Sequence, residues 1–193
     1  NVVLQVGYVG SQGHRLFRFF DINQPSQATI TAEDLACNCI NSVSVSRNYG
    51  FPNGAFYIFQ ENSSGKSNYH SLQTSLNVRN YHGLMSIVNY VWSKSLDNSS
   101  DGEDFVVNAA QPQDSNNPQK EYGLSNFDIR NRFTWILGFE LPKFSGSWPK
   151  LKNGWGMDST VTMQSGQPFT LNYNFEDDFS GGGDGFDRPD VVG

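Results

Sequence analysis

Four charged residues alternate along one predicted strand in the second half of the chain. They are Asp128, Arg130, Arg132 and Glu140. Because successive side chains of a strand point to opposite faces, these four charges share one face. Opposed charges on one face can pair with neighbouring strands or orient a polar ligand. We therefore predict a polar, lumen-like surface, with charge pairing and ligand contact as its two alternative roles.

Catalytic residues are not apparent in the sequence. No nucleophile and base stand at a recognisable spacing, and the three histidines lie near predicted turns and strand ends. These histidines are His14, His70 and His82. We expect the protein not to be an enzyme.

Two acidic loops contain carboxylates spaced in ways that resemble calcium sites. They are Asp97, Asp101 and Asp104 in one loop and Asp184 and Asp187 in the other. The first resembles the start of an EF-hand loop, but Asn108 stands where the bidentate glutamate belongs. The second holds one GGxGxD unit, which cannot build a calcium-binding β-roll alone. Solvated acids are the main interpretation, calcium is the alternative, and no other cofactor is indicated.

The two cysteines, Cys37 and Cys39, are separated by one residue. This spacing fits neither a CxxC redox motif nor a paired zinc knuckle. A local disulfide or two inert thiols is the prediction, and metal binding is a minor alternative.

The composition favours a chain that is aromatic but not strongly hydrophobic. Hydrophobic residues make up 37% and aromatic residues 14% of the sequence, and the mean hydropathy is −0.50. No run of about 18 apolar residues occurs, which excludes a transmembrane helix, whereas membrane strands escape this test because only alternate residues face lipid. The net charge of −6 argues against a nucleic-acid partner.

Strict alternation of polar and apolar residues predicts long strands. Residues 69–96 read as an antiparallel hairpin around a three-residue loop, residues 81–83. One face of its first strand is polar throughout, with Ser71, Gln73, Ser75, Asn77 and Arg79, and the predicted apolar cross-strand pairs are Leu76–Val88, Thr74–Tyr90 and Leu72–Trp92. Strands of about a dozen residues exceed the usual 5 to 6 and reach the 9 to 11 that a membrane strand needs.

The clearest alternation lies in residues 127–141. Phe133, Trp135, Leu137 and Phe139 share its apolar face, where Asn131 is the only polar intruder. Nine residues tilted by ~40° would rise roughly 25 Å, the height of the apolar band of an outer-membrane barrel. The aromatic residues Tyr90, Trp92, Trp135 and Trp155 could form a stacking platform for a ligand, but we interpret them as interfacial girdles or packing.

The chain is predicted to be one all-β segment, residues 1–193, with three antiparallel hairpins. These span about residues 2–23, which turn at 11–13, then 69–96 and 126–173. Long polar loops are expected at residues 24–68, which include a short strand at 54–60, and at 97–125 and 174–193. Loops this long are common on the extracellular side of outer-membrane barrels. The sequence begins in a strand pattern, so we expect a fragment of about six strands, too few to close a wide barrel alone.

Four phrases of the sequence carry a family resemblance: GYVGSQGHRLFRFFDINQP, NYHSLQTSLNVRNYHGLMSIVNYVWSKSLD, EYGLSNFDIRNRFTWILGFELP and MQSGQPFT. In this order they resemble successive barrel strands of TonB-dependent receptors, particularly those with a carboxypeptidase-regulatory-like domain. The resemblance implies a barrel of about 22 strands that takes up bulky ligands. It also implies outer-membrane lipid, a plug and an energy-transducing inner-membrane protein as partners.

Two alternatives remain open from the sequence. A released fragment would leave strand edges and an apolar face uncovered, so identical copies could stack into an extracellular, amyloid-like filament. A soluble β-sandwich binding module is the third interpretation, although sandwich strands are usually shorter.

Overall fold

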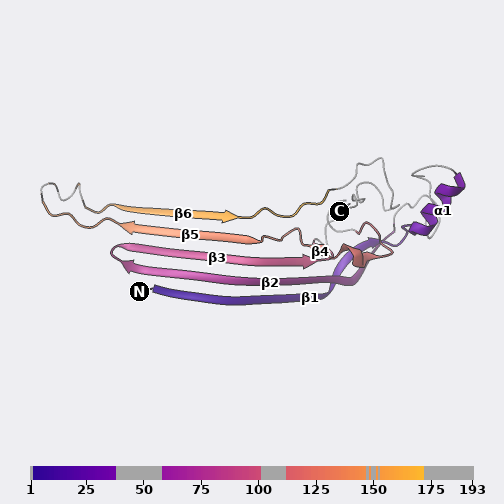
Figure 1. Ribbon diagram of the computed structural model, residues 1–193, viewed down its shortest axis with the longest axis horizontal. Helices are drawn as coiled ribbons and strands as arrows, with labels where there is room; N and C mark the ends of the chain where they lie inside the picture. The colour runs from indigo at the N-terminus through magenta and orange to yellow at the C-terminus, as the bar shows by residue number, and fades with distance from the viewer. Residues whose placement is uncertain are drawn as a thin grey trace. The chain divides into compact units, whose positions relative to one another are not determined.

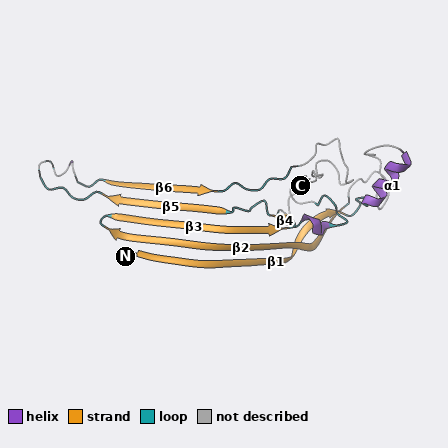
Figure 2. Ribbon diagram, viewed as in Figure 1, coloured by secondary structure: helices purple, strands orange, loops and turns teal. Residues whose placement is uncertain are grey.

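The computed structural model describes residues 2–37, 58–100, 112–146, 148, 151 and 153–171. These residues form an antiparallel sheet in the order β1-β2-β3-β5-β6, with β4 paired to β3 (Figure 1; Figure 2). The elements are β1 Val2–Asp21, α1 Gln27–Cys37, β2 Phe59–Tyr81, β3 Leu84–Asp97, η1 Pro118–Glu121, β4 Gly123–Leu124, β5 Asn131–Glu140 and β6 Gly156–Gln164. The predicted all-β, antiparallel class is confirmed. In this part of the chain β1 and β6 are the outer strands, so the sheet is not closed.

The chain divides into two compact units. The first unit comprises Asn1–Ser11, Tyr69–Ser95 and Asp128–Gln167, and the second comprises the remaining residues. The strands β1, β2 and β3 are each divided between the two units. Each unit is therefore described by itself. Within the described residues, no helix is long and apolar enough to cross a membrane.

The register of β3, β5 and β6 gives the first unit two chemically distinct faces. Leu84 pairs with Phe139 and Trp92 with Asn131, while Phe139 pairs in turn with Met157. Directly opposed residues share a face of the sheet. The apolar face therefore contains Leu84, Val88, Tyr90, Trp92, Phe133, Trp135, Leu137, Phe139, Met157, Val161 and Met163, together with the polar residues Ser86, Asn131 and Ser159. The polar face contains Asn89, Ser93, Arg132, Thr134, Glu140, Asp158, Thr160, Thr162 and Gln164, interspersed with Met85, Ile87, Val91 and Ile136.

The turn between β2 and β3 contains two residues, so the predicted three-residue loop is wrong. β2 ends at Tyr81 and β3 begins at Leu84. His82 and Gly83 both have positive φ, 52° and 83°, the signature of a type I′ turn. A Cβ on Gly83 would lie 2.6 Å from the carbonyl oxygen of Glu140. Glycine is therefore required at this position for two reasons, the positive φ and the lack of space for a side chain. The cross-strand pairs predicted for this hairpin stay predictions.

The first predicted hairpin is also wrong, because β1 continues through residues 11–13 as one strand. Gly13 on β1 and Gly65 on β2 permit a close approach of the two strands rather than a turn. A Cβ on Gly13 would lie 2.5 Å from Ser67 Oγ, and one on Gly65 would lie 2.8 Å from the carbonyl oxygen of Leu16. Arg15 has a φ of 56°, a left-handed conformation that locally interrupts regular strand geometry.

The region predicted as a loop at residues 24–68 contains α1 and the start of β2, which begins at Phe59. Residues 54–57 of the predicted short strand at 54–60 lie outside the described residues. Ser26 caps α1, since its hydroxyl accepts a hydrogen bond of 3.2 Å from the backbone N–H of Thr29. The predicted loop at 97–125 likewise contains η1 and β4. The cap at Ser26 is a local helix signal, and the search for alternating strand residues does not detect such a signal.

The second unit has a polar interior. Among the described residues, Ile30 is the only buried hydrophobic side chain. The buried polar residues of this unit are Arg18, Asp21, Asn23, Gln24, Asn98 and Ser125. They are held by specific contacts: Oδ1 of Asp21 accepts hydrogen bonds of 2.9 Å from the backbone N–H groups of Asn23 and Ile58. Buried polar groups with such partners fix a conformation that apolar packing does not.

Candidate functional site: the polar face of the first unit

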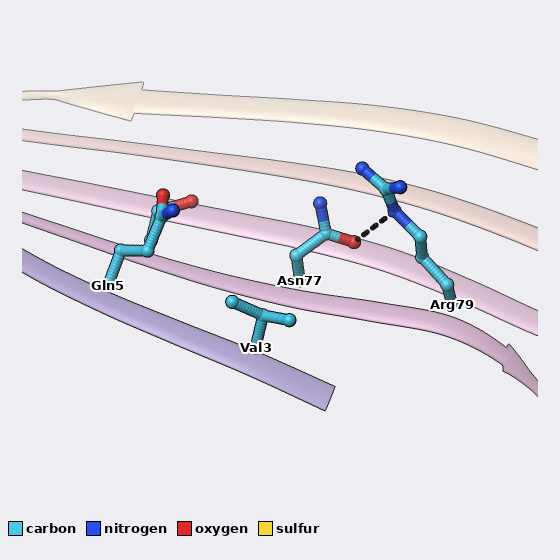
Figure 3. Close-up of a pocket in the computed structure, with 5 residues that line it drawn as sticks. Val3, Gln5, Asn77 and Arg79 are labelled. Carbon is cyan, nitrogen blue, oxygen red and sulfur yellow. Dashed lines mark hydrogen bonds between the residues drawn. The ribbon is translucent and has the colours of Figure 1, made fainter. Parts of the chain in front are cut away.

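A polar strip lies along β1 and β2 in the first unit. Gln5, Ser75, Asn77 and Arg79 line an open hollow of about 340 Å³, together with Val3. Figure 3 shows Asn77 and Arg79 side by side, where Nε of Arg79 donates a hydrogen bond of 3.3 Å to Oδ1 of Asn77. Amide and hydroxyl groups both donate and accept hydrogen bonds, so the strip can contact polar groups of either kind.

Arg79 also connects this strip with the polar face of β3, β5 and β6. It lines a second open hollow of about 720 Å³ with Met85, Glu140 and Asp158. The rest of the lining is Gly83, Leu84, Gly138, Phe139, Leu141, Lys143, Gly154, Trp155 and Gly156. Two cations and two carboxylates therefore surround one hollow, an arrangement that can orient a polar ligand of mixed charge.

The four charges predicted from the alternation fall into separate places. Asp128 and Arg130 come together, with 3.4 Å between a carboxylate oxygen and a guanidinium nitrogen. Asp128 is buried and accepts a hydrogen bond of 2.6 Å from the backbone N–H of Ser95. Arg132 and Glu140 stand near opposite ends of β5, opposite Gln164 and Gly156. Charge pairing thus describes Asp128 and Arg130, whereas Glu140 reaches the larger hollow.

Of the five predicted calcium ligands, only Asp97 lies among the described residues. Both carboxylate oxygens of Asp97 accept hydrogen bonds from Ser100 Oγ, at 2.9 and 3.1 Å. Asp101, Asp104, Asp184 and Asp187 lie outside the described residues. Within the described part of the chain, no three His, Cys, Asp or Glu side chains are grouped to hold a metal.

Cys37 is the last residue of α1, and Cys39 lies outside the described residues. Their disulfide stays a prediction.

Polar atoms on the apolar face pair with one another. The hydroxyl of Tyr90 donates a hydrogen bond of 2.7 Å to Oδ1 of Asn131, the predicted polar intruder. Nε1 of Trp135 donates to Ser86 Oγ at 2.9 Å. On β1 and β2, Tyr8 stacks with His70 at a ring-centroid distance of 6.0 Å, and a hydrogen bond joins the Tyr8 hydroxyl with Nδ1 of His70. Such pairing lets polar atoms remain on an apolar surface.

The second unit contains a further cationic group, Arg18, near the end of β1. Its side chain is fully buried, and Nη1 donates a hydrogen bond of 3.3 Å to the carbonyl oxygen of Pro118. Burial lowers the pKa of Arg18, and the negative charge of Glu121 acts in the opposite direction. Arg18 belongs to the second unit.

Arg79 and Asp158 were not among the site residues predicted from the sequence. The polar alternation ending at Arg79 was visible in the sequence, as was that around Asp158. What was missing was the strand register, which brings both side chains to the same hollow.

An antiparallel sheet with one apolar and one polar face is the arrangement found in the wall of a membrane β-barrel. The family model described as outer membrane beta barrel domain matches residues 1–193. The chain belongs to this family, which places it in the outer membrane. No curated protein and no solved structure matches the chain.

Proposed function

We propose that this chain forms part of the barrel wall of a TonB-dependent receptor, which binds and takes up a polar ligand without catalysing a reaction. The observation that carries the proposal is the separation of faces in the first unit. Phe133, Trp135 and Leu137 share the apolar face, and Arg132 and Thr134 share the other. The apolar face would contact lipid, and the polar face would line the lumen.

The connections between strands support an orientation in the membrane. The turn at His82 and Gly83 is short, whereas long segments join β1 to β2 and β3 to β5. Outer-membrane barrels have short periplasmic turns and longer extracellular loops. We therefore place His82 on the periplasmic side. Trp92 lies toward the opposite end of β3 on the apolar face, so we place it toward the outer leaflet.

The receptor assignment within the barrel family rests on the sequence resemblance, supported by the mixed charges on the polar face. Arg79, Lys143, Glu140 and Asp158 around one hollow suit selective contact with a polar ligand better than passage of ions of one sign. A plug and an energy-transducing inner-membrane protein are the proposed partners.

Face-specific labelling of the protein in outer-membrane vesicles tests the membrane placement. Single cysteines would replace Leu137 on the apolar face and Thr134 on the polar face, in a background with Cys37 and Cys39 changed to serine. Leu137→Cys should react with a lipid-soluble label and resist a charged maleimide, and Thr134→Cys should do the reverse. Equal reaction of both positions with the charged maleimide would refute the proposed wall.

Liposome swelling distinguishes a receptor from a passive pore. Purified protein reconstituted into liposomes should give no swelling in arabinose, because a plugged receptor opens only when driven by its partner. Rapid swelling would assign the chain to an open channel instead. An open porin, reconstituted at the same protein-to-lipid ratio, serves as the positive control.

A further inference from the structure

The connection between β5 and β6, residues 141–155, is long for the end of the sheet at which it begins. The backbone N–H of Glu140, the last residue of β5, donates a 2.9 Å hydrogen bond to the carbonyl oxygen of Gly83. This connection and the two-residue turn at His82 and Gly83 therefore lie at the same end of the first unit (Figure 2). Periplasmic connections of outer-membrane barrels are usually short. Residues 141–155, named here the β5–β6 loop, depart from that pattern.

The described part of the β5–β6 loop exposes large apolar side chains. Phe144 is 51%, Trp148 is 75% and Trp155 is 62% exposed. Leu141 and Leu151 are exposed as well. A single exposed apolar residue is ordinary, whereas a group of them in one short segment marks a surface that contacts something other than water.

Hydrogen bonds of polar groups give this loop its shape. Oδ1 of Asn153 accepts a hydrogen bond of 2.6 Å from the backbone N–H of Phe144, and Nδ2 of Asn153 donates one of 3.0 Å to the Phe144 carbonyl oxygen. Nε1 of Trp155 donates a hydrogen bond of 2.8 Å to the carbonyl oxygen of Leu151. The backbone N–H of Leu151 donates to the carbonyl oxygen of Trp148 at 3.1 Å. The loop is thus held by its polar atoms, and its apolar side chains stay outside.

The loop continues the apolar face of β5 and β6. The backbone N–H of Leu141 donates a 3.0 Å hydrogen bond to the carbonyl oxygen of Trp155, which extends the pairing beyond Phe139 and Met157. Leu141 is two residues after Phe139, and Trp155 is two residues before Met157, so both lie on the apolar face. Where such a face ends at the membrane–water interface, tryptophan is the favoured residue.

The charge of the β5–β6 loop is opposite to that of the chain. Its residues include three lysines, Lys143, Lys150 and Lys152, and no aspartate or glutamate, whereas the whole chain has a net charge of −6. Lys143 is exposed and is the one lysine of the three among the described residues. Lysines beside interfacial aromatic residues attract anionic lipid headgroups, and the attraction increases with each lysine near the surface.

We propose that the β5–β6 loop binds anionic phospholipid headgroups at the membrane surface. Its lysines would contact the phosphate groups, and Phe144, Trp148 and Trp155 would lie at the boundary between headgroups and acyl chains. In the proposed orientation this surface is the periplasmic one. The inference rests on the proposed contact of the apolar face with lipid, and it adds a headgroup preference that ligand uptake does not require.

Quenching of tryptophan fluorescence by brominated lipids tests the proposal. A W92F/W135F background retains only Trp148 and Trp155, both in the loop. The purified protein is reconstituted into an equimolar mixture of phosphatidylglycerol and phosphatidylcholine, in which either one lipid or the other is brominated. We expect quenching to give an apparent preference for phosphatidylglycerol of about fivefold or more. High salt should reduce the preference, because it screens the charges.

Lysine variants in the same background connect this preference to the charge of the loop. K143Q/K150Q/K152Q should reduce it to about one. Lys143 also borders the larger hollow, so K150Q/K152Q separates lipid binding from ligand contact and should lose most of the preference. K120Q is the matched control and should keep the preference, since exposed Lys120 belongs to the second unit and pairs with Asp114 at 3.8 Å. Heat-dependent mobility on electrophoresis checks that each variant is folded.

Equal quenching by the two lipids in the W92F/W135F protein would overturn the proposal. So would an undiminished preference in the triple lysine variant, or its loss in K120Q. If the unmodified protein is quenched but Trp148 and Trp155 alone are not, the loop contacts another partner, such as a periplasmic protein, and the barrel wall stands without this inference. Absence of quenching in the unmodified protein would refute the wall and the inference together. If W92F/W135F does not fold, the unmodified protein and the triple lysine variant provide the same comparison.

Discussion

The hydroxyl group of Tyr90 donates a hydrogen bond of 2.7 Å to Oδ1 of Asn131 on the adjacent strand. Both residues lie on the apolar face, where Asn131 is directly opposite Trp92, two residues along β3 from Tyr90. Each supplies a polar atom that would otherwise lack a partner in lipid. An asparagine on this face is therefore explained by its neighbour rather than by contact with water.

This pair predicts a measurable coupling. Tyr90→Phe should reduce the free energy of unfolding by about 1 kcal/mol, because it removes the donor and leaves the Asn131 acceptor unpaired. Asn131→Leu in the Tyr90→Phe background should cost little more. A double-mutant cycle measured by urea unfolding in detergent should give a coupling energy of about 0.5–1.5 kcal/mol. Strictly additive effects would contradict the interaction.

An arginine on each face of β5 provides a matched comparison. Leu137→Arg places a charge on the apolar face and should destabilise the protein in a bilayer by about 2–4 kcal/mol if it lies near the midplane. Thr134→Arg places it on the polar face and should change stability by less than about 1 kcal/mol. Unfolding in lipid vesicles measures both, and equal losses would contradict the assignment of faces.

The close approach of β2 to β1 in the second unit predicts a large effect of one methyl group. Gly65→Ala would place Cβ 2.8 Å from the backbone carbonyl oxygen of Leu16, and it should destabilise by about 1–3 kcal/mol. Gly7→Ala is the control, because a Cβ there would meet nothing within 4 Å. It should be neutral or slightly stabilising in the same denaturant titration. Similar losses for both variants would argue against the close contact.

Asp128 joins the segment before β5 to β3 through a charged hydrogen bond. Asp128→Asn weakens the acceptor for the Ser95 backbone N–H, at 2.6 Å, and removes the ion pair with Arg130. A loss of about 1.5–3 kcal/mol is expected, measured by guanidinium unfolding in detergent. Asp158→Asn changes an exposed carboxylate and should leave stability nearly unchanged, so a comparable loss there would show that Asp128 has no special role.

The sequence predicted the faces of β5 because side-chain period depends only on the backbone of a strand. Phe133 and Arg132 needed no knowledge of their neighbours to be assigned to opposite faces. The turn predicted at residues 11–13 failed for a tertiary reason: Gly13 makes room for Ser67 on another strand, which a local pattern cannot reveal. The helix α1 was missed because Thr29, Ile30 and Thr31 are β-branched residues that locally disfavour a helix.

The candidate site was only partly predictable for the same reason. Glu140 was identified from alternation within its own strand. Its neighbours Arg79 and Asp158 depend on how the four strands β2, β3, β5 and β6 pair, and pairing register is a property of the folded sheet.

The two-residue turn at His82 and Gly83 has a consequence for the order of assembly. Closing a loop costs chain entropy that rises with the logarithm of its length, so β2 and β3 can meet at far lower cost than β1 and β2, whose ends are Asp21 and Phe59. The backbone N–H of Glu140 on β5 then donates a 2.9 Å hydrogen bond to the Gly83 carbonyl oxygen. The hairpin of β2 and β3 therefore presents a formed strand edge with which β5 can pair. We expect β2 and β3 to nucleate the sheet and β1 to join late, with hydrogen exchange protection during refolding appearing in that sequence.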